Sequence, residues 1–268
     1  MNAPVGTRSE TRGCAVGAPG NSTHRARPDY NQFHSQHRGF SLMELIVVLA
    51  VVTILTSLLM PALNKLRENV HKVVCASNLR QIAVAKSIYA ADHYDNLPPS
   101  INLSPQAGIW EPQELMVSRT PRSDAPGAWD GFGLLFKQGY CGSFECFYCP
   151  SHTGQHPLSR YADRWHSEEE QVIYTNYHYS GDRDWQTGMR RFFVRPSTLV
   201  IATDGLRTAS DINHQFGVNA AYGDGSVRWR PDMVTILDLL PKQNEAGNTN
   251  PVNSEKYNQI WSILEDQR

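Results

Sequence analysis

An uncharged apolar segment near the N-terminus constrains this chain more than any other feature of its sequence. The sixteen residues from Leu45 to Met60 carry no charge, and apolar side chains dominate the wider stretch from Phe40 to Leu63. A helix rises about 1.5 Å per residue, so this stretch is long enough to cross a hydrocarbon core about 30 Å thick. The sequence therefore predicts a transmembrane helix over residues 40–63.

Glu44 and Pro61 are the two unusual residues of this segment. A carboxylate costs about 2.5 to 3.5 kcal/mol near the centre of a bilayer and less near an interface, so Glu44 needs a partner. Pro61 removes one backbone hydrogen bond and clashes with the preceding turn. It therefore predicts a kink or a locally loosened helix.

The segment resembles the prepilin-type N-terminal cleavage and methylation segment of type IV pilins and type II secretion pseudopilins. Members of that family are cut after a glycine, usually begin their mature chain with Phe, and carry Glu at the fifth mature position. Gly39, Phe40 and Glu44 match this pattern, and Pro61 stands where family members often carry a helix-bending proline. The resemblance implies cleavage between Gly39 and Phe40 and N-methylation of Phe40 by a prepilin peptidase. It also implies assembly with other pilin-like subunits, in which Glu44 and Pro61 take part.

Three simpler interpretations of the apolar segment remain open. A secretory signal peptide has a shorter apolar core and a cleavage site of small residues, and residues 58–62 offer no such site. An uncleaved signal anchor explains the hydrophobicity, but it explains neither the Gly39 and Phe40 pair nor Glu44. A buried core helix fits better inside a domain than behind a polar leader.

The leader, residues 1–39, is polar and basic. It holds five arginines against one Glu and one Asp, a net charge of +3, so residues 40–268 carry −4. The positive-inside rule keeps such a leader in the cytoplasm. We therefore expect a single-pass protein of the bacterial inner membrane, with its head on the periplasmic or extracellular side. The leader is rich in Gly, Pro, Ser and Asn and shows no periodicity, which predicts disorder, and the resemblance implies its removal.

After the apolar segment the pattern becomes amphipathic while it keeps a helical period. Apolar residues recur at three- and four-residue spacings from Leu63 to Ala83, with charged residues between them. We expect the helix to continue as a stalk over residues 64–96 and to end at the turn-forming run from Asp95 to Pro99. The stretch from Cys75 to Pro99 also resembles the C-x-x-NL-x-Q-I run of a large bacterial group of pseudopilin-like proteins.

Residues 97–268 form the expected exported globular head. Between residues 100 and 170 the sequence predicts loops, short helices and one strand, with a short helix opening at Gly131. The stretch from Ser197 to Thr203 is typical of a buried strand that ends at Asp204.

The end of the head is expected to be a hairpin, a linker and a helix. Residues 217–230 predict two short strands around an Asp-Gly turn. A polar linker over residues 242–253 and a short amphipathic helix over residues 257–264 follow. These elements predict the α+β class. The resemblance implies a pilin-like arrangement, with a long N-terminal helix packed on a small antiparallel β-sheet head that has long loops.

Four cysteines remain when the leader, with Cys14, is removed. An even number in an exported domain favours disulfides over reactive thiols. Cys75 with Cys149 is the first candidate pair, because this bond would pin the head to the stalk helix. Cys141 with Cys146 is the rival pair.

A zinc site and free thiols are the competing interpretations of these cysteines. Cys146 and Cys149 form a C-x-x-C pair, and His152 and His156 follow it. A structural zinc normally uses thiolates that are kept reduced, which an exported domain does not guarantee.

A second motif lies in the hairpin region, residues 214–230. His214 is followed by nine residues and then by Asp224 and Gly225, and this resembles the H-x9-DG motif at the C-terminus of the same pseudopilin-like group. One interpretation brings His214, Asp224 and Asp204 together around calcium. In the other, Asp224 caps the turn and His214 bonds to a backbone carbonyl. Calcium prefers six to eight oxygen ligands with several carboxylates, so we favour the second and expect no cofactor.

The sequence as a whole predicts a non-enzymatic structural subunit of a type II secretion or type IV pilus-like filament. The implied partners are a prepilin peptidase, other pilin-like subunits and the inner membrane. The net charge of −1 and a pI of about 6.8 give no basic field for nucleic acid.

Two functions of other classes remain open. One is a membrane-anchored exported enzyme that uses His214, Asp204 and Asp224, although no nucleophile lies beside a base in the sequence. The other is a glycan- or protein-binding module, built on aromatic residues that can equally fill a core. These aromatic residues are Trp165, Tyr174, Tyr177, Tyr179 and Trp185.

Overall fold

The chain divides into two compact units, residues 1–52 and 53–268. A computed structural model describes residues 39–104, 108–184, 187–192, 197–214, 216–231, 233–241 and 251–265, with only the backbone at 233 and 251–254. The leader before Gly39, most of the expected linker and Trp185 lie outside the described residues.

Helix α1 spans Leu42–Asp92, so it begins two residues after Phe40. It is continuous through Pro61, where the sequence predicts a kink or a loosened turn. Large apolar side chains are exposed along its first part, through Met60. In the part of the chain that the structure describes, α1 is the helix with a stretch long and apolar enough to cross a membrane, by length and composition.

The end of α1 is set by a left-handed turn, four residues before the expected boundary. Tyr94 and Asp95 have φ values of 55° and 59°, and the left-handed conformation stops a helix. The Asp95 amide donates to the Ala90 carbonyl at 2.8 Å, and Asn96 Nδ2 donates to the His93 carbonyl at 2.7 Å. The first bond satisfies a carbonyl that the last turn leaves without a helical partner, and the second holds the turn that follows the helix.

The head is built on a four-stranded antiparallel sheet in the order β5-β6-β7-β8. Its strands are β5 (Tyr177–Tyr179), β6 (Val200–Asp204), β7 (Val218–Tyr222) and β8 (Val227–Arg230). Every residue of β5, β6 and β7 is buried, whereas β8 is half-buried at the edge. The expected strand before Asp204 and the expected hairpin are both present.

The turn between β7 and β8 forms for the reason that the Asp-Gly pair predicts. Gly225 has a φ of 83°, which a residue without a Cβ adopts at little cost. Asp224 Oδ1 accepts a hydrogen bond from the Ser226 amide at 2.9 Å, so Asp224 caps the turn.

The rest of the head consists of short elements. Two small antiparallel ladders join β1 (Leu103–Ser104) to β2 (Ile109–Trp110) and β3 (Val117–Arg119) to β4 (Ile173–Tyr174). The helices are α2 (Phe132–Lys137), α3 (Leu158–Tyr161), α4 (Met233–Leu239) and α5 (Pro251–Glu265). The 3-10 turns are η2 (Pro112–Glu114), η3 (Pro126–Ala128), η4 (Phe144–Phe147), η5 (Ala162–Arg164) and η6 (Ala209–Asp211).

The short elements correct several details of the sequence prediction. Among the described residues between 100 and 170 there are three strands, not one, and each is only two or three residues long, too short to show alternation. The last helix is longer than expected and includes the last three residues of the predicted linker. The class itself is as predicted: the fold is α+β, with a long N-terminal helix and small antiparallel sheets joined by loops.

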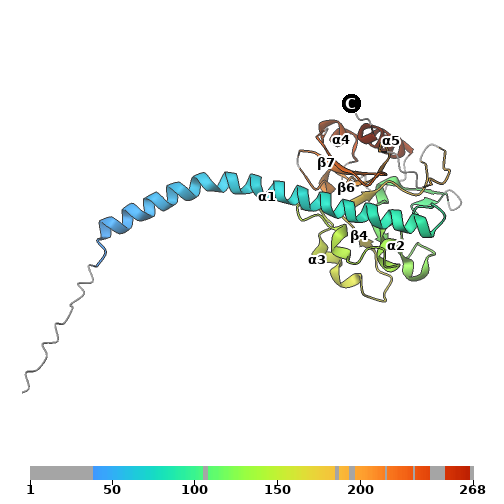
Figure 1. Cartoon of the computed structure of the whole chain (residues 1–268), viewed down its shortest axis with the longest axis horizontal. Helices are drawn as coiled ribbons and strands as arrows, with labels where there is room; N and C mark the ends of the chain where they lie inside the picture. The colour runs from blue at the N-terminus through green and yellow to red at the C-terminus, as the bar shows by residue number, and fades with distance from the viewer. Residues whose placement is uncertain are drawn as a thin grey trace, which may run out of the picture. The chain divides into compact units, whose positions relative to one another are not determined.

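The C-terminal half of α1 forms the middle of the head core. The head elements lie on both sides of it in Figure 1, with β6, β7, α4 and α5 on one side and β4, α2 and α3 on the other. Asn78 Nδ2 donates to the Tyr148 carbonyl at 3.1 Å, and Lys86 Nζ donates to the Ile201 carbonyl at 2.8 Å. Burial lowers the pKa of Lys86 well below its usual value. This half of α1 is therefore an integral core element and not only a stalk.

Candidate functional site

The predicted processing residues lie at the exposed start of α1. Gly39 and Phe40 precede the helix without regular structure, and Phe40 is 80% exposed. Glu44 lies in the first helical turn and is also exposed, where a negative charge is favoured by the helix dipole. A Cβ added at Gly39 would meet no atom within 4 Å.

Cys75 and Cys149 are joined by a disulfide, with their Cα atoms 5.5 Å apart. Cys75 is on the buried face of α1, and Cys149 follows η4 in the loop that leads to α3. This is the pair that the sequence places first. The bond holds the loop of the head against the helix.

The rival pair, Cys141 and Cys146, consists of two buried free thiols. They are hydrogen-bonded neighbours, which lowers the pKa of Cys141 and raises that of Cys146. Cys141 Sγ also donates to the Ser143 carbonyl at 3.5 Å. The two thiols therefore lie close to each other, and neither takes part in the disulfide.

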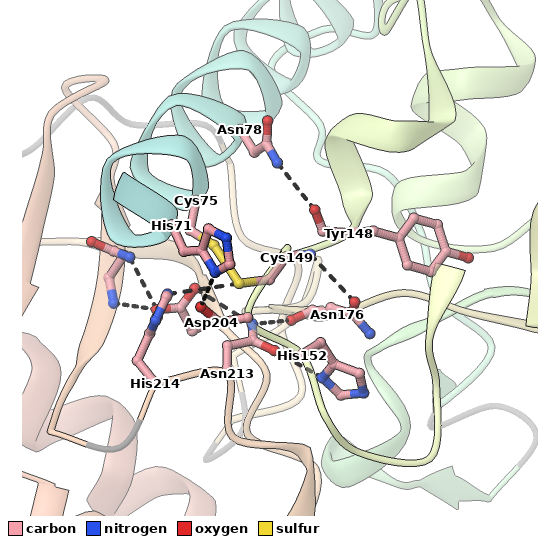
Figure 2. The surroundings of a disulfide bond; sticks show 12 residues. His71, Cys75, Asn78, Tyr148, Cys149, His152, Asn176, Asp204, Asn213 and His214 are labelled. Carbon is pink, nitrogen blue, oxygen red and sulfur yellow. Dashed lines mark hydrogen bonds and ion pairs between the residues drawn. A yellow bond between two sulfur atoms is a disulfide. The ribbon is translucent and has the colours of Figure 1, made fainter. Parts of the chain in front are cut away.

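His214 and Asp204 lie beside the disulfide, as Figure 2 shows. His214 Nε2 is 3.8 Å from Asp204 Oδ2 and 3.7 Å from Cys149 Sγ. Burial raises the pKa of Asp204, and the charge of His214 and hydrogen bonds from Asn219 and Asn213 oppose that shift.

The other ring nitrogen of His214 faces the long helix and not a backbone carbonyl, contrary to the sequence interpretation. Nδ1 lies 2.7 Å from Glu68 Oε1. Glu68 is a site residue that the sequence analysis missed. It precedes Cys75 by two helical turns and so lies on the same face of α1, and this spacing is the signal that could have identified it.

Asp224 is not part of this group. It lies at the exposed hairpin turn, where its nearest opposite charge is Arg228, 3.8 Å away. Hydrogen bonds from Ser226 lower its pKa. The structure thus brings His214 and Asp204 together but leaves the third residue of the proposed calcium trio, and of the proposed enzyme site, elsewhere.

The zinc ligands that the sequence suggests, Cys146, Cys149, His152 and His156, do not converge, and three of them are bonded to other residues. Cys149 is in the disulfide, while His152 Nδ1 is 2.9 Å from Asn213 Oδ1 and His156 Nδ1 is 2.7 Å from the Tyr161 hydroxyl. Burial lowers the pKa of His152 and lowers that of His156 to about 4. No group of Cys146, His152 and His156 with metal-binding geometry occurs among the described residues.

The aromatic residues proposed as a binding surface mostly fill the core. Trp165, Tyr177 and Tyr179 are at most 2% exposed, and Tyr174 is half-buried. Trp165 Nε1 donates to the Tyr148 hydroxyl at 3.0 Å. Side chains packed in this way have no free face for a glycan.

Comparison with known proteins identifies the N-terminal segment. Residues 34–60 match the family model described as the prokaryotic N-terminal methylation motif. The chain carries this motif. No curated protein and no solved structure matches the chain. The motif supports a type IV pilin-like or pseudopilin protein, and together with the apolar start of α1 it indicates a single-pass, membrane-anchored one.

Proposed function

We propose that this chain is a structural subunit of a type II secretion or type IV pilus-like filament. The observation that carries the proposal is the methylation motif over residues 34–60, which includes the uncharged part of α1. A prepilin peptidase cuts between Gly39 and Phe40 and methylates the new amine of Phe40. The mature chain then joins other pilin-like subunits through α1.

The apolar side chains of α1 support assembly by this helix. The predicted amphipathic stripe begins at Leu63, but its first four members are between 51% and 70% exposed in the isolated chain. These residues are Leu63, Leu66, Val70 and Val73. A continuous exposed apolar surface marks a contact with lipid or with another protein. In our proposal, neighbouring α1 helices cover the part that lies outside the membrane.

Orientation follows from charge. The leader carries +3 and the remainder −4, so the positive-inside rule retains the leader in the cytoplasm and exports the head. The cleavage site then faces the cytoplasmic side of the inner membrane, and the head is periplasmic or extracellular.

We do not propose a catalytic role. The enzyme hypothesis requires His214, Asp204 and Asp224 to act together, and Asp224 lies apart at an exposed turn. The other two residues, His214 and Asp204, are at most 1% exposed to solvent.

Intact-mass analysis of the protein from its native membrane tests the proposal. We expect a chain that begins at Phe40 and carries one added methyl group. Gly39→Val should block cleavage, because the larger side chain obstructs the close approach of a protease to the backbone. Gly142→Val is the matched control, since a Cβ there also meets no atom within 4 Å. A mature N-terminus at another residue, or an unprocessed wild-type chain in a host that has the peptidase, would overturn the proposal.

A further inference from the structure

Four buried side chains of metal-ligand type converge at one point of the head. They are Cys75, Cys149, Asp204 and His214, and one potential ligand atom from each lies within 4.8 Å of the others. Figure 2 shows them together around the two sulfurs. They come from α1, from the loop after η4, from β6 and from the loop before β7.

The disulfide explains the two sulfurs but not the other two side chains. A buried carboxylate and a buried imidazole lose solvation, and a bond between two cysteines requires neither. Their ligand atoms nevertheless lie within 4.8 Å of the sulfurs. His214 Nε2 is 3.7 Å from Cys149 Sγ and 3.8 Å from Asp204 Oδ2. Zinc prefers thiolate, imidazole and carboxylate ligands in a tetrahedron, and its bond lengths separate neighbouring ligand atoms by about 3.3–3.8 Å. The two distances from His214 Nε2, 3.7 and 3.8 Å, fall within that range.

Hydrogen bonds hold the imidazole and the carboxylate in orientations suited to a metal ion. His214 Nδ1 is paired with Glu68 Oε1 at 2.7 Å, which leaves Nε2 to face the cluster. A carboxylate on the remote nitrogen is typical of metal-bound histidine, because it fixes the tautomer and orients the ring. Asp204 Oδ2 accepts hydrogen bonds from the Asn219 amide at 2.5 Å and from Asn219 Nδ2 at 3.2 Å, and its Oδ1 accepts one from Asn213 Nδ2 at 3.5 Å.

An ion has a route to this point. His214 and Glu68 both line an open groove beside α1, together with His71 and Asn213. His214 is thus the member of the cluster that reaches the groove, and all four cluster residues are at most 5% exposed.

We propose that Cys75, Cys149, His214 and Asp204 bind one zinc ion whenever the Cys75–Cys149 disulfide is open. The same four residues then fasten the head loop to α1 in two ways, by an ion in the reduced chain and by a covalent bond in the oxidised chain.

The two states interconvert by thiol–disulfide exchange. When a protein disulfide oxidises the site, the two thiolates of Cys75 and Cys149 lose two electrons and form their S–S bond. The oxidant takes up those electrons and two protons and becomes a dithiol, while Zn²⁺ leaves. In the opposite direction a dithiol reductant opens the bond, and zinc displaces the proton from each thiol.

The test compares the full chain, purified in detergent, in its oxidised form and after reduction by a phosphine under anaerobic conditions. Both forms are incubated with zinc and freed of unbound ion, and the bound metal is measured by elemental analysis. We expect one zinc per reduced chain and none on the oxidised chain. A reduced chain without zinc, or equal zinc on both forms, would overturn the proposal, and neither result depends on a substitution.

Cobalt identifies the ligands. Co²⁺ in the reduced chain should give intense visible bands of a tetrahedral ion and a thiolate charge-transfer band in the near ultraviolet. The weak spectrum of six-coordinate cobalt would contradict the proposed ligand set.

Substitutions then locate the ion. Glu68→Gln should weaken zinc binding about 10- to 100-fold, the usual effect of losing the partner of a metal-bound histidine. Replacing Cys141 and Cys146 together by Ser is the matched control, because it removes the other two thiols of the head and should leave the zinc content of the reduced chain at one. Loss of zinc from this control, with zinc retained in Cys75→Ser, would place the ion elsewhere and refute the assignment.

Discussion

His214 Nδ1 lies 2.7 Å from Oε1 of Glu68, a residue 146 positions earlier in the chain. The second oxygen of Glu68 accepts a hydrogen bond from Ser151 Oγ at 2.9 Å. One carboxylate on α1 therefore holds the loop before β7 and the loop after Cys149. Polar contacts attach the head to α1 at Glu68. Two helical turns later, at Cys75, the attachment is covalent.

Glu68→Gln should lower the free energy of unfolding by about 1 kcal/mol at neutral pH, because it keeps the shape of the side chain but removes its charge. Burial raises the pKa of Glu68, but hydrogen bonds from His214 and Ser151 outweigh burial and make the net shift downward. The charge therefore stabilises the fold fully above the ordinary value of 4.5 and ceases to do so as the pH falls through the folded-state pKa.

Chemical denaturation of both chains at neutral pH and at a pH of about 3 measures this effect. The difference between wild type and Glu68→Gln should be largest at neutral pH and should shrink in acid. An equal difference at both pH values would show that the charge does not contribute.

Asp130→Asn should have the opposite pH signature. The Asp130 carboxylate accepts hydrogen bonds from Ser100 Oγ at 2.7 Å and from the Ile101 amide at 2.8 Å, yet burial raises its pKa to about 7. The folded state therefore holds a proton that the unfolded state releases, and the stability that this gives is full below the ordinary value of 3.8 and is lost as the pH rises to about 7.

An asparagine at position 130 cannot ionise, so its chain should lose less stability between pH 3.8 and about 7 than wild type does. Thermal unfolding across that range measures the difference. Parallel curves for wild type and Asp130→Asn would contradict a raised pKa at this carboxyl.

The elements that the sequence predicts well are those whose signal is local. The start of α1 follows from uncharged residues, and the β7–β8 hairpin follows from the Asp-Gly turn at Asp224 and Gly225. Helix α4 was missed, and β1 to β5 were not individually predicted. These strands are two or three residues long and carry too little alternation to be recognised in the sequence.

In the site, too, the sequence predicted some features and missed the contacts between residues far apart in the chain. The Cys75 and Cys149 pair was the first candidate because the bond would pin the head to the stalk helix, and few other pairings were open to four cysteines. The contact between Glu68 and His214 was not, since no periodicity connects positions so far apart and the motif beginning at His214 directed attention to Asp224 instead. The spacing of that motif fixes a turn, while the side chains that converge are brought together by the tertiary fold.

Removing the disulfide should cost the head a large part of its stability. The two cysteines are 74 positions apart, and closing a loop of that size contributes on the order of 4 kcal/mol in the chain-entropy account. Replacing both Cys75 and Cys149 by Ser should lower the denaturation midpoint strongly. The same change at Cys141 and Cys146 serves as the control and should have a smaller effect. All measurements use oxidised, metal-free protein. Equal midpoints for the two double variants would contradict this role for the bond.

Thiol labelling checks the oxidation state directly. A reagent that alkylates free thiols in the unfolded, unreduced chain should leave Cys75 and Cys149 unmodified. Alkylation of Cys75, Cys141, Cys146 and Cys149 without prior reduction would show that no disulfide forms.

Glu44 should control the assembly of subunits and leave the fold of the head unchanged. Phe40 and Glu44 are four residues apart, and cleavage after Gly39 creates a positive amine on Phe40. Before cleavage that amine does not exist, and the carboxylate has no such partner. In a filament, the amine of one subunit and the carboxylate of its neighbour satisfy each other when the two helices are offset by about one turn. An unpaired charge among apolar helices is costly, so this pair favours one register.

Glu44→Leu should insert into the membrane at least as well as wild type, fold its head normally, and enter filaments poorly. Glu44→Asp should be intermediate, because the shorter side chain keeps the charge, and Glu44→Gln should resemble Glu44→Leu, because it keeps only the polarity. Each variant is expressed with the assembly machinery, and sheared or cross-linked filaments are measured against total membrane subunit. Protease resistance of the head serves as the folding control. Wild-type assembly by Glu44→Leu would remove the pairing mechanism and leave Glu44 as an incidental charge at the membrane interface.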